Sequence, residues 1–132
     1  MSSPASFESL GDEKYVLLTT VRRSGIGVPT AVWAAADDGA LYVTTLASAG
    51  KVKRIRNNPA VTLQPCTMSG RVKAHATPIA ARAEIIDDPD GLAVGNAIVE
   101  KKYGWQFRLA FRAEQRHGGG ASSRVILKIT PA

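Results

Sequence analysis

The chain has 132 residues, of which 45% are hydrophobic, and this size and composition predict one domain with a modest core. Seventeen Lys and Arg against eleven Asp and Glu give a net charge of +6, which favours an anionic ligand or nucleic acid. One cysteine excludes an internal disulfide and a thiolate metal cage, and no apolar run approaches the roughly 20 residues that span a membrane. The first residues lack the features of a secretion signal, so we expect a cytoplasmic protein without a membrane partner.

The N-terminal part of the sequence alternates β-forming segments with turns. A short helix is expected over residues 6–11, with Ser6 as its cap. The β-branched and aromatic residues that follow predict three strands, at 15–21, 29–36 and 41–45. Turn residues separate these strands, at 22–25 and at the Asp-Asp-Gly of 37–39, so two successive hairpins are expected.

Residues 49–57 are predicted to form a short basic helix that stops at Asn-Asn-Pro, with Ser48 as its N-cap. At about 100° per residue, Val52 and Ile55 share an apolar stripe. Two of the four cations on this helix lie beside the stripe and are held at the edge of the core: Lys51 and Arg54. The other two point away from it: Lys53 and Arg56.

This helix suits an anion. Its first turn offers unpaired N–H groups and a partial positive charge, to which the cations beside the apolar stripe add theirs. We therefore predict a phosphate or carboxylate site formed by Ser48, Gly50, Lys51 and Arg54. A solvated basic helix face without a ligand is the alternative interpretation.

The second half of the sequence contains further strands and longer helices. Strands are predicted at 60–67, 71–87 and 124–130, and one face of the second carries Ile79, Ala81, Ala83 and Ile85. A helix is expected from Asp88 to about Tyr103. It should bury Leu92, Ile98 and Val99 and expose Glu100, Lys101 and Lys102. Another helix is expected over 105–116, and Gly118, Gly119 and Gly120 predict a flexible loop.

These elements predict a mainly β fold in one domain over residues 1–132. Five or six strands joined by short turns form a largely antiparallel sheet, and closing into a β-barrel would remove its exposed edges. The short helices then lie outside the barrel.

Few side chains in the sequence are suited to catalysis. His75 and His117 are the only imidazoles and, with one cysteine, form no recognisable metal set. The aspartates lie mainly in turns and at helix ends, where turn and cap chemistry explains them. No catalytic residue is therefore assigned. An enzyme of this kind would rely on a bound cofactor for its chemistry.

Residues 41–63, LYVTTLASAGKVKRIRNNPAVTL, resemble the split-barrel oxidoreductases related to pyridoxamine phosphate oxidase. In that family a strand ending in Thr, then Ser and Lys, and a short helix closing with Asn-Pro hold the cofactor phosphate. The hairpin at 20–25 and the strand that begins at Pro29 match the family's first two strands. The similarity covers roughly residues 13–87 and implies an FMN-binding-like split barrel.

Within that family the chain is most similar to the subgroup of deazaflavin-dependent reductases, which bind coenzyme F420. This resemblance implies a homodimer with two cofactor sites at the subunit interface and hydride transfer at the deazaflavin ring. Members that use FMN carry basic residues on the second strand, whereas no Lys or Arg lies between Gly27 and Ala36 here. Carried over by position, the cofactor tail meets Ser48, Gly50, Lys51, Arg54 and Arg56, and the ring is lined by Thr30, Val32, Thr44 and Thr45.

The leading hypothesis is therefore a reductase that transfers a hydride between reduced F420 and a small organic acceptor. An FMN enzyme on the same barrel and a non-catalytic F420-binding protein are the alternatives. A nucleic-acid-binding barrel is disfavoured because the basic helix has no aromatic residue among its cations. Three aromatic residues are candidates for the substrate pocket, with core packing as the alternative role: Trp33, Trp105 and Phe107.

Overall fold

The computed structural model describes residues 6–109 and 123–132. In these ranges the chain forms, in order, η1 (Glu8–Asp12), β1 (Tyr15–Val21), β2 (Gly27–Val32), β3 (Ala35–Asp37), β4 (Ala40–Leu46), α1 (Gly50–Asn57), β5 (Ala60–Cys66), η2 (Lys73–His75), β6 (Ile79–Ile86), α2 (Pro89–Tyr103) and β7 (Arg124–Pro131).

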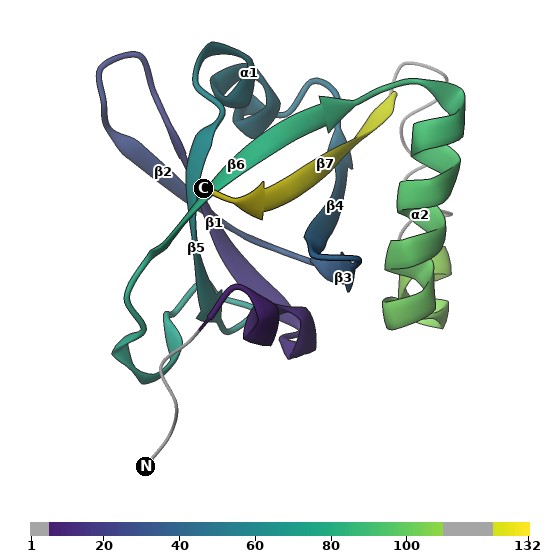
Figure 1. Cartoon of the computed structure of the whole chain (residues 1–132), viewed down its shortest axis with the longest axis horizontal. Coiled ribbons are helices and arrows are strands. Elements are labelled where there is room, and N and C mark those ends of the chain that lie inside the picture. The colour runs from purple at the N-terminus through teal and green to yellow at the C-terminus, as the bar shows by residue number, and fades with distance from the viewer. Residues whose placement is uncertain (1–5, 110–122) are drawn as a thin grey trace.

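The seven strands of the described residues form one antiparallel sheet in the order β2-β1-β5-β6-β7-β4-β3. The sheet curls into a barrel, as Figure 1 shows. Its two edge strands, β2 and β3, are consecutive in the chain and are separated only by Trp33 and Ala34. The mainly β split barrel predicted from the sequence is confirmed.

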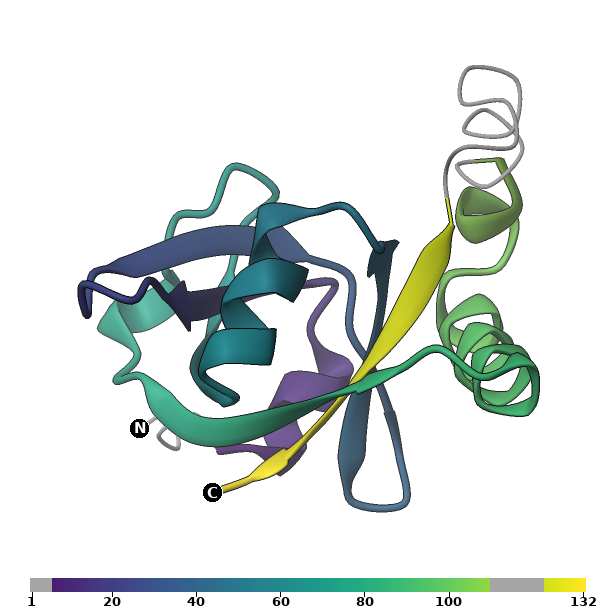
Figure 2. The same ribbon diagram turned by 90° about the horizontal axis from the view of Figure 1, so that it is seen from above.

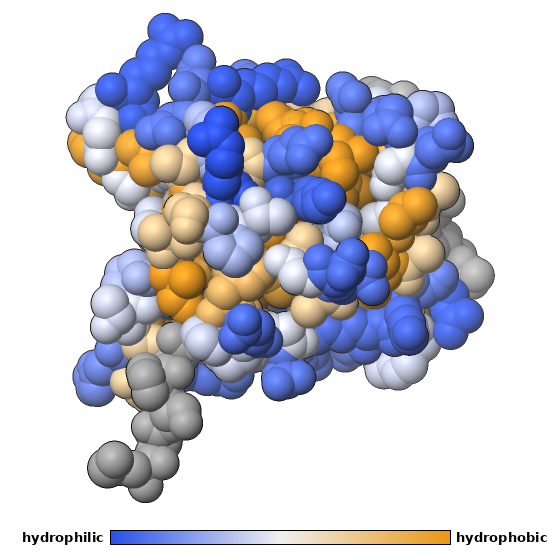
Figure 3. Space-filling view, in the orientation of Figure 1, coloured by the Kyte–Doolittle hydropathy of each residue, from blue (hydrophilic) through white to orange (hydrophobic). Residues whose placement is uncertain are grey.

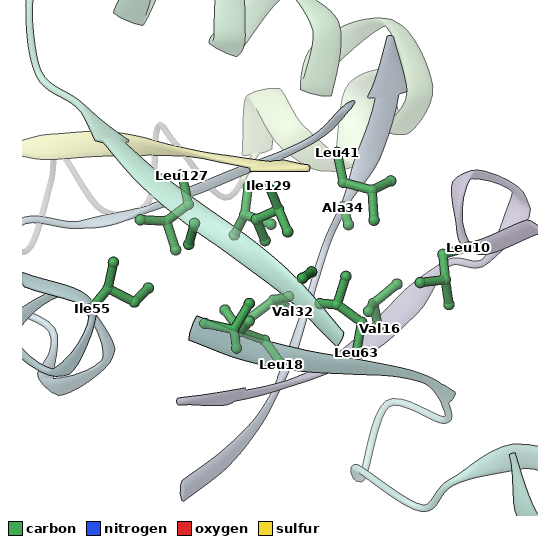
Figure 4. Close-up of a cluster of buried hydrophobic side chains, with 14 residues drawn as sticks. Leu10, Val16, Leu18, Val32, Ala34, Leu41, Ile55, Leu63, Leu127 and Ile129 are labelled. Carbon is green, nitrogen blue, oxygen red and sulfur yellow. The ribbon is translucent and has the colours of Figure 1, made fainter. Parts of the chain in front are cut away.

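Alternate residues of the strands point into the barrel, where they form its core (Figure 4). Val16, Leu18 and Leu127 are completely buried there. The two ends of the barrel are closed by short helical segments, α1 at one end and η1 at the other (Figure 1). Ile55 from α1 and Leu10 from η1 join the same core, so both segments are held by apolar contacts.

A second hydrophobic cluster lies outside the barrel, where α2 packs on β3, β4 and β7 (Figures 1 and 2). Val99 and Tyr103 of α2 contact Tyr42 and Ile126 of the sheet in this cluster. The helix begins as expected, because the Asp88 carboxylate accepts a hydrogen bond of 2.8 Å from the Gly91 N–H. It ends at Gly104, whose positive φ of 59° favours glycine.

A single strand was predicted at 29–36, but the structure has two strands there, β2 and β3. The chain bends at Trp33 and Ala34, so that β2 pairs with β1 and β3 pairs with β4. Two successive hairpins do result, and the second turns at Asp38 and Gly39, both with positive φ. The predicted strand at 71–87 was too long, since regular pairing of β6 with its neighbours begins only at Ile79.

The side-chain predictions for Ser48 and Lys102 were wrong. Ser48 does not cap α1, which begins after Ala49 without a side-chain cap. Lys102 does not face water, because its ammonium group donates hydrogen bonds to the backbone carbonyls of Glu13 and Ala34. Helical structure resumes from 105 to 109. The rest of the helix expected over 105–116, His117 and the glycine loop lie outside the described residues.

The surface combines charged and apolar areas. On the face displayed in Figure 3, hydrophobic residues reach the surface in patches between hydrophilic ones. Trp105 and Val94 are among the large hydrophobic residues that are more than half exposed. In the described parts of the chain, no helix has both the length and the apolar character needed to cross a membrane.

The contact between α2 and β7 predicts the effect of one substitution. A Cβ atom at Gly95 would lie 2.6 Å from Cγ1 and 2.8 Å from Cγ2 of the fully buried Ile126. Gly95→Ala gains about 1 kcal/mol of helix propensity, but overpacking costs about 1 to 3 kcal/mol. We expect a net decrease in the free energy of unfolding, measured by urea denaturation. Val94→Ala is the control on the exposed side of α2; an equally stable Gly95→Ala variant would contradict this packing.

Candidate functional site

A cavity of about 330 Å³ lies on the outside of the barrel, near the first turn of α1. Its lining consists of aromatic residues, threonines, cationic residues and two small apolar residues. The lining residues are Tyr15, Ala31, Val32, Trp33, Thr44, Thr45, Lys51, Phe107 and Arg124.

The alternation of the strands explains why part of this lining faces outward. Val16 pairs with Val32 and both belong to the interior core, so their neighbours in the sheet point the other way. Ala31 is therefore on the outer face of β2. Trp33 is half-buried outside the barrel, where its ring stacks on Tyr103. Phe107, which is 8% exposed, provides a second aromatic wall.

The cavity lining also carries positive charge and hydroxyl groups. Lys51 Nζ lies 3.4 Å from the Thr45 hydroxyl, and Arg124 Nε donates to the Thr44 hydroxyl at 3.0 Å. Both threonines are on β4, next to the start of α1. Because β4 pairs with β7, the first residue of β7 is brought beside the helix.

Lys51 is held in an unfavourable electrostatic environment. Burial lowers the pKa of its ammonium group, and the nearby charges of Arg54 and Arg124 lower the pKa further. In the part of the chain that the structure describes, neither Lys51 nor Arg54 forms an ion pair. Bringing an anion to this group would relieve the repulsion, so the cationic side of the cavity is suited to a phosphate or a carboxylate.

Six of the twelve residues predicted from the sequence line this cavity: Val32, Thr44, Thr45, Lys51, Trp33 and Phe107. The helical wheel of α1 is also confirmed, since Val52 and Ile55 are buried while Lys53 and Arg56 are exposed. The structure thus brings Thr44 and Thr45, one α1 cation and two of the three aromatic candidates together.

The other six residues lie elsewhere: Thr30, Ser48, Gly50, Arg54, Arg56 and Trp105. Thr30 pairs with Leu18, an interior residue, and so faces the barrel side of β2. Arg54 donates from Nε to the buried Thr20 hydroxyl at 2.6 Å. Its guanidinium also covers Gly50, where an added Cβ would lie 2.8 Å from Nη1. Trp105 is 63% exposed and is not part of the lining.

Three lining residues were not predicted: Tyr15, Ala31 and Arg124. A signal for Arg124 was present, because the expected alternation of Val125, Leu127 and Ile129 places Arg124 on the outer face. Its position beside Lys51 depends on the pairing of β4 with β7, which joins residues 80 positions apart, as the hydrogen bond from Arg124 to Thr44 shows. Local periodicity contains no information on that pairing.

The described lining contains neither a carboxylate nor an imidazole. It therefore offers no acid–base pair of the usual kind. Within the same described ranges, no three His, Cys, Asp or Glu residues gather as a metal site would require. Aromatic residues and cations that line one cavity can bind and orient a ring compound that carries an anionic group.

Comparison with proteins of known structure identifies the fold of this site. An F420 reductase is 24% identical and superposes with a TM-score of 0.54, over 98% of this chain and 96% of the other. The heme storage protein of Vibrio cholerae is 13% identical with a TM-score of 0.67, over 96% and 85% of the two chains. A pyridoxamine 5'-phosphate oxidase-related, FMN-binding protein of Nostoc punctiforme is 14% identical with a TM-score of 0.58, over 95% and 74%.

At these identities the similarity establishes the fold alone. A search of curated proteins finds no match. The sequence profile described as pyridoxamine 5'-phosphate oxidase, however, matches residues 3–132, which is nearly the whole chain. The protein therefore belongs to the pyridoxamine 5'-phosphate oxidase family.

Proposed function

We propose that the protein is an oxidoreductase that binds coenzyme F420 in this cavity and transfers a hydride between the reduced cofactor and a small organic acceptor. The observation that carries this proposal is the half-buried Lys51, which lies near Arg124 in a cavity that Trp33 and Phe107 also line. That arrangement matches a planar ring with an anionic tail. The similarity to an F420 reductase supports the same assignment.

The residues present fit such a cofactor. A volume of about 330 Å³ is at the lower end of the roughly 300–1,000 Å³ typical of ligand pockets, so we expect it to hold the ring system and leave the tail near the protein surface. Lys51 and Arg124 would meet the phosphodiester or the carboxylates of the tail. When bound, the deazaflavin supplies the hydride.

The protein's own side chains then bind and orient rather than react. Trp33 and Phe107 would pack against the ring and exclude water from it. The hydroxyls of Thr44 and Thr45 would accept or donate hydrogen bonds at its polar edge, next to the cations that already contact them. No proton transfer by a chain carboxylate or imidazole is required in this scheme.

FMN is the alternative cofactor, favoured by the FMN-binding relative on the same fold. Against FMN stands β2, Gly27–Val32, which has no Lys or Arg to help bind a flavin phosphate. Titration of the protein with F420 and with FMN, followed by fluorescence, separates the two. Tighter binding of FMN would replace F420 in the proposal, and F420 binding without reduction of any acceptor would indicate a cofactor-binding protein.

The two faces of α1 allow a matched test of the charged side. We expect Lys51→Ala to weaken F420 binding roughly tenfold to a hundredfold, because a charge-assisted hydrogen bond contributes about 1.5 to 3 kcal/mol. Lys53→Ala removes the same charge from the exposed face and should change the dissociation constant little at moderate salt. Equal losses that added salt abolishes would indicate a diffuse basic surface instead of a site.

The lowered pKa of Lys51 predicts how binding depends on pH. An anion is held by the protonated ammonium group, so affinity should be full below the pKa of Lys51 and should fall as pH rises through it. Because burial and the neighbouring arginines lower that pKa, the fall should begin below the ordinary lysine value of 10.5. Dissociation constants between about pH 7 and pH 11 measure it. Lys51→Arg, which stays protonated, should remove this decline; an unchanged profile would exclude Lys51 as its source.

We further propose that the protein acts as a homodimer, in which a second copy completes the wall of the cofactor site. Trp105 and Leu109, 63% and 55% exposed, are large apolar residues next to the lining residue Phe107 and would be covered by such a partner. Light scattering at micromolar concentration should give twice the mass of the chain. A monomer under these conditions would contradict this arrangement.

A further inference from the structure

The end of α2 is tied to the strands beside the cavity through one hydroxyl group. Tyr103, which is 6% exposed, accepts a hydrogen bond of 2.9 Å from the Ala34 N–H. Its own proton faces two carbonyl oxygens, that of Lys14 at 2.7 Å and that of Ala34 at 3.1 Å. The hydroxyl therefore connects two backbone segments that are distant in sequence.

Each bonded residue is the immediate neighbour of a lining residue. Lys14 precedes Tyr15, and Ala34 follows Trp33, while Tyr15 and Trp33 both line the cavity. Ala34 also lies in the two-residue link between β2 and β3, where no strand pairing fixes the backbone. Tyr103 therefore supplies hydrogen bonds to Ala34, whose backbone has no partner strand in the sheet.

The ring of Tyr103 contacts the same segment of the chain, Trp33 and Ala34, as its hydroxyl does. It stacks on Trp33 with a centroid separation of 4.6 Å and an interplanar angle of 9°. Phe107 follows Tyr103 by four residues and joins it in the outer cluster. Lys102, the residue before Tyr103, donates to the Ala34 carbonyl at 2.6 Å. Tyr103 itself is not part of the lining.

We propose that Tyr103 is a positioning residue that holds Trp33 against the cavity and thereby sets the affinity of the site for a ligand with a planar ring. The assignment of a ring ligand rests on the function proposed above. The orientation of Trp33 does not, because the contacts that hold it are within the protein. Tyr103 acts through Trp33 and the Ala34 backbone without touching the ligand.

Burial of the Tyr103 hydroxyl keeps this connection intact over a wide pH range. Burial raises the pKa of Tyr103 to about 12, with an opposing effect of the backbone hydrogen bond from Ala34 and a reinforcing effect of Tyr15. Lys102 Nζ lies 5.2 Å from the centroid of the Tyr103 ring. The phenol is thus protonated, and its hydrogen bonds persist, well into the alkaline range.

The test compares Tyr103→Phe, which keeps the ring and removes the hydroxyl, with Tyr42→Phe as a matched control. Tyr42 is a buried tyrosine of the same outer cluster, and its hydroxyl has no hydrogen-bond partner among the described residues. Every protein in this comparison, the reference included, carries Trp105→Phe, so that Trp33 is the remaining tryptophan of the two in the chain. Fluorescence and near-ultraviolet circular dichroism then report on Trp33 without any ligand.

We expect Tyr103→Phe to change the spectra of Trp33 and to weaken binding of F420 or FMN roughly tenfold, while the dissociation constant of inorganic phosphate changes less than about twofold. Tyr42→Phe should alter none of these. Lys102→Met, which removes the second hydrogen bond to the Ala34 carbonyl, should change the Trp33 spectra in the same direction and serves if Tyr103→Phe does not fold.

Unchanged Trp33 spectra in both Tyr103→Phe and Lys102→Met would overturn the positioning role. Equal losses of ring-ligand and phosphate binding would also overturn it, because they would indicate a general loosening of the fold. If the unaltered protein binds neither F420 nor FMN, the proposed function fails, and the Trp33 spectra still decide whether Tyr103 positions that side chain.

Discussion

The structure depends on one constraint, the two-residue link that joins the edge strands of the sheet. β2 and β3 lie at opposite ends of the strand order, yet only Trp33 and Ala34 separate them. The chain can satisfy this only if the sheet curls until its edges approach each other. The curled sheet encloses the apolar interior, and the bend that it requires turns Trp33 out of the barrel, toward the cavity.

The same bend creates a local deficit of hydrogen bonds, and α2 compensates for it. Backbone groups that leave a strand must find other partners when they are buried. At Ala34 both the N–H and the C=O are bonded by side chains from the last turn of α2, those of Tyr103 and Lys102. The docking of α2 is therefore part of closing the barrel as well as of building the cavity wall.

The four cationic side chains of α1 differ in burial, because the helix packs its apolar stripe against the core. Lys51 is half-buried at the cavity and Arg54 is bonded to the buried Thr20 hydroxyl, while Lys53 and Arg56 remain in solvent. Lys51 and Arg54, the two cations beside the apolar stripe, thus have different roles. Arg54 satisfies an interior hydroxyl and shields the start of the helix, and Lys51 keeps its charge directed at the cavity.

The sequence alone was sufficient for the features that depend on neighbouring residues. Period-two and period-3.6 patterns located β1, β4, β5, β7, α1 and α2 and the buried stripe of α1, and motif similarity indicated the family. These patterns did not show that 29–36 bends, since a bend between two β-forming runs leaves the alternation of side chains intact. They also did not show that α1 lacks a serine cap, because propensity describes a preference and not the contact made.

Tertiary structure alone decided which residues share the cavity. Arg124 reaches Lys51 through the pairing of β4 with β7, and Tyr103 reaches Ala34 across 69 positions of the chain. Arg54 was placed correctly on its helix, but it turned to Thr20 of β1 instead of the cavity. Side-chain periodicity fixes which face of its own element a residue occupies, whereas the element that covers that face is set by long-range strand pairing and helix docking. For this reason the sequence predicted six of the nine lining residues, and only the fold determined which residues meet.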